Sequence, residues 1–472
     1  MLFPSVIFLF YFFPIVLMFY YVFSFSRTIQ NFILFISSII FYAFGEPKYV
    51  ILIIISIIIN YFFGIFISKS NNKISKILLI LSCIANLSIL FVFKYLTFVL
   101  YNVKSAFGLE NMIIPRILIP IGISFFTFQA MSYVIDVYKG TAKVQKNILN
   151  LGLYIVLFPQ LIAGPIVRYS TFEDQIKNRK ETLRKFSVGC TRFIIGLSKK
   201  VIISNTMAII ADRIFSMSAE GSIPLSLAWL GSISYSFQIF YDFAGYSDMA
   251  IGLGLIFGFT FSENFNYPYV SKSISEFWRR WHISLGTWFR DYVYFPLGGS
   301  RVKNKDKIIR NLFIVWILTG VWHGAEWTFI VWGILHFVFI SFEKVISFEK
   351  LNIEPIFKHI YTLFIINFSW VLFRAGDLKQ AGLYIHSMFN FISNDIWSSY
   401  TYMFIKENII IFIFAILFSM PIAKRANFLI VNKYKGYKVF EFLYPVAIMM
   451  IFLVSISYIV KGTYNPFIYF NF

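Results

Sequence analysis

Long apolar runs separated by short polar segments extend along the chain. Windows of about twenty residues or more with at most one charged side chain include Met1–Ser26, Tyr49–Ser68 and Ile77–Tyr101, and a later run begins at Asn408. A helix needs about 20 apolar residues to cross the roughly 30 Å of hydrocarbon in a bilayer. The pattern therefore predicts an all-α, polytopic membrane protein.

Four spanning helices are expected in the first hundred residues, at Leu2–Phe25, Asn31–Phe44, Tyr49–Ile67 and Ile77–Tyr101. The first run has no basic residue at its start and no small-residue cleavage site, so we expect a retained helix and not a signal peptide. The loop Ser68–Lys76 carries three lysines and no acidic residue. Because basic residues collect in cytoplasmic loops, we predict that this loop is cytoplasmic.

The segment Ile113–Val137 is apolar, but prolines, a glycine and polar side chains interrupt it. Leu149–Pro165 is interrupted in a similar way. Non-helical backbone at membrane depth is tolerated where it is buried in protein or lines a cavity, so a broken and buried helix is one interpretation. An ordinary helix with a proline kink is the other.

The rest of the chain contains one long polar segment and several apolar ones. Arg168–Lys185 carries both signs of charge and is expected to be a cytoplasmic loop that is partly amphipathic helix. Apolar segments follow at Phe193–Phe215, Leu225–Phe240, Asn311–Trp322, Trp327–Phe342, a stretch ending at Arg374, Leu378–Phe391, Ile409–Pro421 and Phe442–Val460. We expect about ten to twelve transmembrane helices, with re-entrant and interfacial helices, in one domain over residues 1–472.

Composition supports the membrane class and limits the partners. Hydrophobic residues make up 58% of the chain and the mean hydropathy is +0.73, whereas soluble domains are about 45–50% apolar. The net charge of +20 would suggest nucleic acid in a soluble protein, but no basic segment is long enough to form a separate domain. We therefore expect a multi-pass protein of the cytoplasmic (inner) membrane whose partner is the lipid bilayer, with no nucleic acid.

The two cysteines, Cys83 and Cys190, lie far apart in sequence and indicate no disulfide framework. No cluster of cysteines and histidines has the spacing of a metal site. We expect no metal and no bound cofactor.

His323 is the first candidate for chemistry. It lies in the sequence TGVWHGAEW, between Gly320 and Gly324. Small neighbours allow close approach of backbone or substrate, and a histidine takes up and releases protons near neutral pH. The residue could act as general base for a hydroxyl of another molecule. A histidine hydrogen-bonded between helices is the alternative.

His282 lies in the more highly charged of the two histidine sites, SEFWRRWHISLGTWFRD, together with Arg279, Arg280, Arg290 and Asp291. If this segment is one helix, Trp278, Trp281 and His282 share a face. Arg279, Arg280, Trp281 and Arg290 are the residues that we expect to hold a phosphate-bearing acyl donor. Anchoring of Arg and Trp at the membrane boundary is an equally good interpretation.

Asp242 and Asp248 stand out in the glycine-rich segment Tyr235–Asn266. The sequence GLGLIFG within it follows no strand, so we interpret the glycines as sites of close helix packing and not as a nucleotide loop. The two aspartates either accept structural hydrogen bonds or line a polar cavity.

Several longer stretches resemble membrane-bound O-acyltransferases of the bacterial alginate O-acetyltransferase type. They are FPQLIAGPIVRY, YDFAGYSDMAIG, NFNYPY, SEFWRRWHISLGTWFRDYVYFPLGG, LTGVWHGAEWTFIVWG, SWVLFRA and FIYFNF, in this order from Phe158 to the last residue. The resemblance implies a ring-like helical fold with a central tunnel. It also implies that His323 matches the catalytic histidine and His282 the second histidine.

The resemblance further implies an acyl thioester donor on the cytoplasmic side, either acetyl-CoA or an acyl carrier, and a polysaccharide acceptor reached from outside. An extracytoplasmic acetyltransferase is the expected protein partner. The terminal FIYFNF is similar to tails in which a tyrosine, here Tyr469, relays an acyl group or docks a partner. An aromatic residue anchored at the membrane interface is the other interpretation of Tyr469.

These features favour an enzyme that passes an acyl group, expected to be acetyl, across the membrane for O-acylation of a surface or exported polysaccharide. D-alanyl transfer to teichoic acid from a carrier protein is the alternative within the family. A transporter or flippase of a lipid-linked precursor is the alternative of another class. The absence of an internal repeat and of matched interrupted segments weighs against it.

Overall fold

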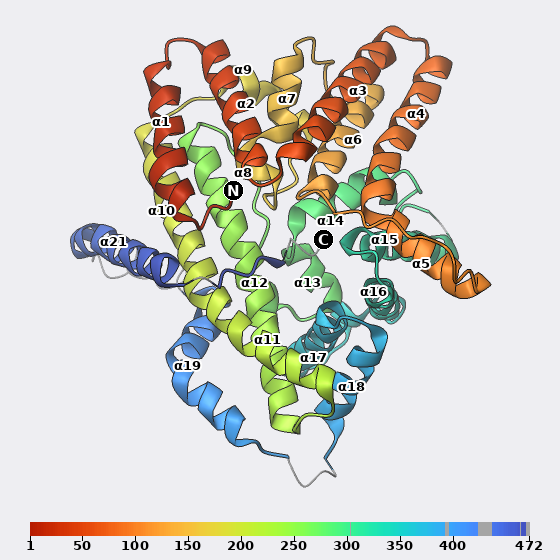
Figure 1. Cartoon of the computed structure of the whole chain (residues 1–472), viewed down its shortest axis with the longest axis vertical. Coiled ribbons are helices and arrows are strands. Elements are labelled where there is room, and N and C mark those ends of the chain that lie inside the picture. Colours follow the sequence, from red (N-terminus) through yellow and green to blue (C-terminus); the bar gives the residue numbers. More distant parts are fainter. Residues whose placement is uncertain (303, 392–395, 423–436, 463, 469–472) are drawn as a thin grey trace. The chain divides into compact units, whose positions relative to one another are not determined.

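The computed structural model describes the chain except residues 303, 392–395, 423–436, 463 and 469–472. Every regular element in this described part is a helix, so the all-α class is confirmed (Figure 1). The described residues pack as two compact units, one of Met1–Phe193 and Met249–Ser262, the other within Ile194–Asp248 and Glu263–Ile468. The expectations of a single domain and of a central tunnel stay predictions.

The helices of the first unit are η1 (Phe8–Phe12), α1 (Phe13–Val22), α2 (Arg27–Ala43), η2 (Pro47–Tyr49), α3 (Val50–Lys69), α4 (Asn72–Leu90), η3 (Phe91–Tyr95), α5 (Leu96–Phe107), α6 (Ile123–Lys139), α7 (Ile148–Val156), α8 (Phe158–Leu161), α9 (Tyr169–Asn178) and most of α10 (Leu183–Ser198). Helix α3 packs against both α4 and α6. Asn60 of α3 and Asn86 of α4 exchange side-chain hydrogen bonds of 3.0 and 2.9 Å, and both residues are buried. Reciprocal amide bonds of this kind hold apolar helices together where water is absent.

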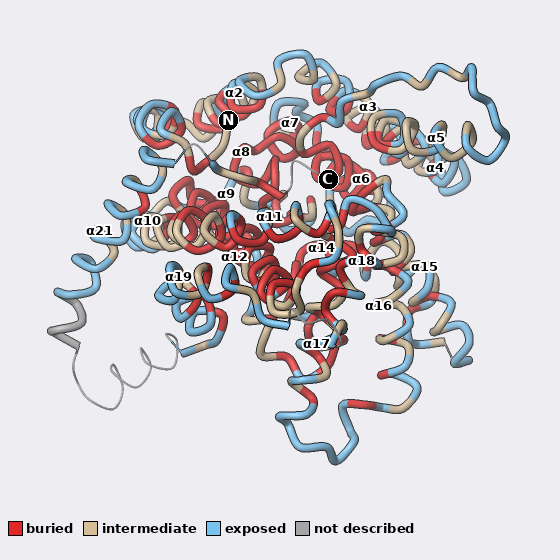
Figure 2. The backbone as a smooth tube through the Cα atoms, turned by 60° about the horizontal axis from the view of Figure 1, so that its bottom comes forward, coloured by how far each residue is buried: buried red, intermediate tan, exposed pale blue. Residues whose placement is uncertain are grey.

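The helices of the second unit are η4 (Lys199–Ser204), α11 (Asn205–Glu220), most of α12 (Leu225–Ile256), η5 (Pro268–Val270), α13 (Ile274–Arg280), α14 (Ile283–Phe289), η6 (Arg290–Tyr294), α15 (Lys305–His323), α16 (Trp327–Val345), η7 (Phe348–Lys350), α17 (Pro355–Arg374), α18 (Leu378–Phe389), α19 (Ser399–Phe418) and α21 (Tyr437–Lys461). Helix α12 is buried along most of its length (Figure 2). It has no single apolar face because protein surrounds it on nearly all sides.

Seven helices in the described part of the chain are long and apolar enough to cross a membrane: Pro47–Lys69, Asn72–Phe107, Leu183–Glu220, Trp327–Val345, Pro355–Arg374, Ser399–Phe418 and Phe442–Lys461. Two shorter apolar helices, Phe8–Val22 and Arg27–Ala43, join them. The protein is therefore a multi-pass membrane protein. Helices α12 and α15 are also long, but their charged residues and α12's serines keep them out of this set.

The interrupted segment before α6 is a broken one, and the interpretation as a proline-kinked helix is wrong. Residues 112–120 form no regular element, and α6 starts after Gly122, which has a φ of 75°. A Cβ at Gly122 would lie 2.7 Å from the carbonyl oxygen of Leu161. Both the left-handed backbone and the close approach require glycine. Most of α6 is buried (Figure 2), whereas the irregular residues before it are largely exposed, with Ile113 at 91% and Leu118 at 66%, so the helix and not the broken backbone is enclosed by protein.

Candidate active site

His323 is the last residue of α15 and is 5% exposed. Extended backbone at Gly324 follows it, and α16 begins at Trp327, so the histidine lies in the turn of a helical hairpin. Helices α15 and α16 pack closely because Gly320 faces Gly333. A Cβ at Gly320 would lie 2.5 Å from the carbonyl oxygen of Phe329, and one at Gly333 only 2.6 Å from that of Trp316. These glycines therefore allow two backbones to meet.

Three aromatic rings surround the His323 imidazole. The ring centroids of Trp322, Trp332 and Phe373 lie 4.9, 5.0 and 5.1 Å from it, each in an edge-on arrangement. They come from α15, α16 and α17, which fixes the imidazole at the point where these three helices converge. Edge-on ring contacts of this kind hold one orientation.

His282 lies between two helices, and the prediction that it continues a helix with Trp278 and Trp281 is wrong. Helix α13 ends at Arg280, Trp281 is extended, and His282 has φ 45° and ψ 52°, in the left-handed region. A non-glycine residue in this conformation costs of order 1–3 kcal/mol and persists only where surrounding structure enforces it. The local sequence gives no sign of this break, because it contains neither glycine nor proline.

Asn264 enforces the break at His282. Its backbone carbonyl accepts the N–H of Ile283 at 2.9 Å, and its side-chain oxygen accepts the N–H of Ser284 at 3.0 Å. Its side-chain nitrogen donates to the Ser247 hydroxyl of α12 at 2.9 Å. The first turn of α14 thus finds its hydrogen-bond partners in a distant loop. Asn264 begins the NFNYPY sequence, but its role depends on contacts that are distant in sequence.

The other end of α13 is held by a buried carboxylate from α16. Glu343 is 4% exposed and accepts the backbone N–H groups of Ile274 at 2.6 Å and of Ser275 at 2.9 Å. It also accepts the Ser275 hydroxyl at 2.7 Å. A negative charge at a helix N-terminus is stabilising. Helix α13 and the His282 turn are therefore fixed at both ends.

One tryptophan lies beside both histidines. The Trp322 ring centroid is 6.2 Å from that of His282 and 4.9 Å from that of His323. The structure thus brings together the two histidines that the sequence singled out. Burial lowers the pKa of His282 from 6.5 to about 3, so its imidazole is neutral near pH 7. A neutral imidazole offers one N–H donor and one nitrogen acceptor.

The arginines of the expected donor site are each paired with a carboxylate. Arg279 binds Glu349 at 2.5 Å on the surface, and this hydrogen bond lowers the pKa of Glu349. Arg280 pairs with Glu276 one helical turn before it at 2.9 Å, and Arg290 with the adjacent Asp291 at 3.2 Å. The described contacts do not join these arginines in one cluster.

Trp281 is buried, with 3% exposure. Its ring packs on those of Phe277 at 5.4 Å and Trp370 at 5.0 Å. It is therefore a packing residue of the second unit, and any contact with a donor stays a prediction.

His336 belongs to the same aromatic cluster as His323, which the sequence did not reveal. It is fully buried, accepts the indole N–H of Trp278 at 3.3 Å, and lies 4.7 Å from the Trp332 ring. The available signal was the four-residue spacing between Trp332 and His336, which places them on one face of α16.

Asp242 and Asp248 both form ion pairs, as structural residues would. Asp248 pairs with Lys199 at 2.6 Å, and Asp242 with Lys200 at 2.7 Å. The first pair is partly exposed, whereas both side chains of the second are only 1% exposed. Both aspartates and both lysines can be read from the sequence, but which lysine pairs with which aspartate cannot.

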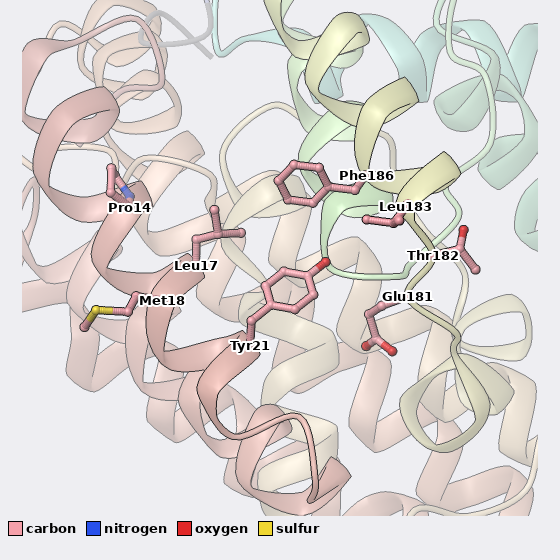
Figure 3. Close-up of a pocket in the computed structure, with 8 residues that line it drawn as sticks. All are labelled: Pro14, Leu17, Met18, Tyr21, Glu181, Thr182, Leu183 and Phe186. Carbon is pink, nitrogen blue, oxygen red and sulfur yellow. The ribbon is translucent and has the colours of Figure 1, made fainter.

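The first unit has a pocket of its own. A groove of about 590 Å3 between α1 and the start of α10 in the first unit is lined mainly by apolar side chains, with Tyr21 and Glu181 at its polar end (Figure 3). Among the described residues, no three side chains of His, Cys, Asp or Glu are grouped as a metal site requires. Tyr469 lies outside the described residues, and its role stays a prediction.

Comparison with known proteins defines the class. Residues 142–373, which include His282 and His323, match the model of the membrane-bound O-acyltransferase (MBOAT) family. Together with the similarity of relatives over 83% of the chain, this match shows that the chain belongs to the membrane-bound O-acyltransferase family. It is an O-acyltransferase.

The relatives act on different polymers according to their names. The chain is 42% identical to the probable alginate O-acetylase AlgI of Pseudomonas putida, over 83% of this chain and 81% of the relative. It is 37% identical to the peptidoglycan O-acetyltransferase of Helicobacter pylori, over 81% of this chain and 78% of the relative. A teichoic acid D-alanyltransferase of Bacillus subtilis is 34% identical but aligns over only 49% of this chain and 60% of its own length.

Proposed function

We propose that this O-acyltransferase transfers an acetyl group from a cytoplasmic thioester to a hydroxyl of an exported polysaccharide, directly or through an extracytoplasmic acetyltransferase. The observation that carries the proposal is the pair of buried histidines beside one tryptophan, in a chain with 42% identity to a named alginate O-acetylase. The site of action is the cytoplasmic membrane, where the cytoplasmic donor and the exported acceptor can both be reached.

His323 is the proposed general base. Its imidazole nitrogen takes the proton of the attacking hydroxyl while the hydroxyl oxygen bonds to the thioester carbonyl carbon. The carbon–sulfur bond then breaks, and the sulfur leaves as a thiol after receiving a proton. The products are an ester and a free thiol, so no oxidant or reductant is needed.

His282 is proposed to assist as a neutral group. Because its imidazole is uncharged near pH 7, it can donate or accept one hydrogen bond without adding charge to a dry site. The rings around His323 exclude water, which strengthens every polar interaction made there. Arg279, Arg280 and Arg290 are proposed to contact the phosphates of the donor, exchanging their present carboxylate partners for phosphate.

Replacement of the base tests the proposal. His323→Asn keeps the size of the side chain and removes its basicity, so the acylation rate should fall about 10²–10⁴-fold. His386→Ala is the matched control, because His386 is an exposed histidine of the same unit, on α18. Both variants should reach normal amounts in the membrane. If the His323→Asn variant acylates as fast as the wild type, His323 is not the general base.

D-alanyl transfer is the second candidate, supported by the similarity to a teichoic acid D-alanyltransferase over 49% of the chain. Purified protein can be incubated in turn with acetyl-CoA, an acetylated carrier protein and a D-alanylated carrier protein. The acetyl proposal expects His323-dependent loss of an acetyl thioester. If only the D-alanyl thioester is consumed, D-alanyl transfer replaces acetyl transfer as the function.

A further inference from the structure

The last described segment of the chain, Tyr464–Ile468, runs from the surface of the second unit into its interior. Exposure falls from 43% at Tyr464 to 4% at Phe467 and 7% at Ile468. The Tyr464 hydroxyl donates to Asp212, and Phe467 packs against Tyr246 with 5.0 Å between ring centroids. We call this segment the C-terminal strap.

A buried ion pair binds the backbone of the strap. Lys200 of η4 and Asp242 of α12 lie 2.7 Å apart, and both side chains are 1% exposed. The Lys200 ammonium donates to the carbonyl of Pro466. The second carboxylate oxygen of Asp242 accepts the N–H of Ile468 at 2.9 Å. Each charge therefore has one partner in the pair and one in the strap.

The energetics explain why the strap is needed. Two charges that are buried together lose their hydration. Their mutual attraction offsets this loss only when their remaining hydrogen-bond donors and acceptors are also satisfied. Here the strap backbone supplies a carbonyl to Lys200 and an N–H to Asp242. The strap therefore completes the ion pair, and the ion pair fixes the strap.

A neighbouring pair provides an internal comparison. Lys199 and Asp248 join the same two helical segments at 2.6 Å, but their side chains are 26% and 15% exposed. The Lys199 ammonium donates to a carboxylate oxygen of Asp248. Two ion pairs of the same chemistry on the same helical segments thus differ in burial.

Helix α12 connects the strap to the His282 turn. Asp242 and Tyr246 contact the strap. The next residue, Ser247, accepts the hydrogen bond of Asn264, which enforces the His282 turn. The strap and the turn are therefore held by the same two helical turns of α12.

We propose that Lys200 and Asp242 are positioning residues that clamp the C-terminal strap on α12 and thereby keep the His282 turn in its active geometry. The catalytic part of this inference rests on the proposed function, whereas the clamp itself does not. The partner recognised by the pair is the peptide backbone of this chain's own C-terminal segment.

Thiol labelling of the full-length protein in detergent tests the clamp. Ile468→Cys, placed after replacement of Cys83 and Cys190 by Ser, puts the only thiol in the strap and keeps its backbone N–H. The rate of labelling by N-ethylmaleimide then reports how often the strap leaves the interior. We expect slow labelling in this parent protein, because residue 468 is 7% exposed.

Two matched double variants are compared in this background. Lys200→Met with Asp242→Ala removes the clamp without leaving a buried charge unpaired, and labelling should become at least about tenfold faster. Lys199→Met with Asp248→Ala removes the comparison pair and should leave the rate within about twofold. Equal rates for the clamp variant and the parent, or an equal increase in both variants, would overturn the clamp.

Acyl transfer tests the positioning role. The clamp variant should lose at least about tenfold in kcat with little change in the donor KM, because the clamp touches none of the proposed donor residues. Wild-type kcat together with fast labelling would overturn this role. If the parent transfers no acyl group, the proposed function fails, and labelling still decides the clamp.

A change in the strap itself covers the case in which the clamp variant does not fold. Ile468→Pro removes the N–H that Asp242 accepts and leaves the ion pair with balanced charges. With a thiol at Phe467→Cys, labelling should again rise at least about tenfold, whereas Ile468→Leu should not change it. Equal rates for these two variants would contradict the inference.

Discussion

Asn264 binds Ser284 twice through one atom: its side-chain oxygen accepts the Ser284 N–H at 3.0 Å and the Ser284 hydroxyl at 2.9 Å. This contact holds the start of α14, and with it the left-handed backbone of His282. Asn264 therefore acts through the backbone after His282 to set where the imidazole points.

The first prediction follows from this contact. Asn264→Ala removes the oxygen that accepts the backbone N–H and the hydroxyl of Ser284. The free energy of unfolding should therefore fall by about 1–3 kcal/mol, and the rate of acyl transfer should fall as well. Asn264→Asp keeps the acceptor and should recover much of both. Ser247→Ala, which removes the contact of Asn264 with α12 but keeps its oxygen on Ser284, should lower both by less than Asn264→Ala does. Denaturation in detergent and transfer assays measure the two effects, and full activity in Asn264→Ala would separate the turn from function.

The second prediction concerns the α15–α16 hairpin. A Cβ at Gly320 would lie 2.5 Å from the Phe329 carbonyl oxygen, so Gly320→Ala must push the two helices apart. We expect the free energy of unfolding to fall by about 1–3 kcal/mol and the rate of acyl transfer to fall clearly. Gly382→Ala is the control, because a Cβ there meets no atom within 4 Å. That helical substitution should be neutral or stabilise by up to about 1 kcal/mol.

The third prediction concerns pH. The pKa of His282 is about 3 in the folded protein against an ordinary value of 6.5, so between these values the unfolded imidazole binds a proton that the folded one does not. Stability should therefore fall as the pH decreases through this window, with a slope from this residue that approaches about 1.4 kcal/mol per pH unit.

His282→Asn should remove that part of the slope. Denaturation midpoints measured between about pH 6 and pH 4.5 give the slopes of both proteins. His386→Ala, at an exposed position, should keep the wild-type slope. Identical slopes in the wild type and His282→Asn would show that the imidazole becomes charged in the folded protein.

The fourth prediction separates anchoring from donor binding at Arg279. The Arg279–Glu349 pair is more than half exposed, with 59% and 57% side-chain exposure, so its loss should have little effect on stability. If Arg279 contacts donor phosphates, Arg279→Ala raises the donor KM, whereas Glu349→Ala frees the arginine and leaves the KM unchanged or lower. An unchanged KM in both variants would favour membrane anchoring.

The membrane class and most helices could be predicted from local sequence. Apolar runs of about twenty residues have few alternatives to a spanning helix, so the expected segments at Tyr49–Ile67 and Trp327–Phe342 correspond to α3 and α16. His323 could be found because its chemistry and its glycine neighbours are adjacent in sequence.

The break at His282 could not be predicted, because its cause is distant in sequence. SEFWRRWHISLG reads as one helix, but bonds from a distant loop end it at Arg280: Asn264 accepts the N–H of Ser284, and the Asn266 N–H donates to the Arg280 carbonyl at 2.9 Å. The pairing of Lys200 with Asp242 is also non-local, and it depends on a chain end more than two hundred residues away. Patterns within a segment carry no information on such contacts.

The glycine contact between α15 and α16 has a consequence for access to His323. Helices that meet backbone to backbone through Gly320 and Gly333 resist separation, because a gap of up to about 1 Å already loses a quarter to a half of the dispersion attraction between them. The two helices therefore hold the histidine at the tip of one closely packed hairpin. Of the three rings around the imidazole, Phe373 of α17, 5.1 Å away, is the one carried by a helix outside the hairpin, so a shift of α17 would uncover the imidazole without opening the hairpin.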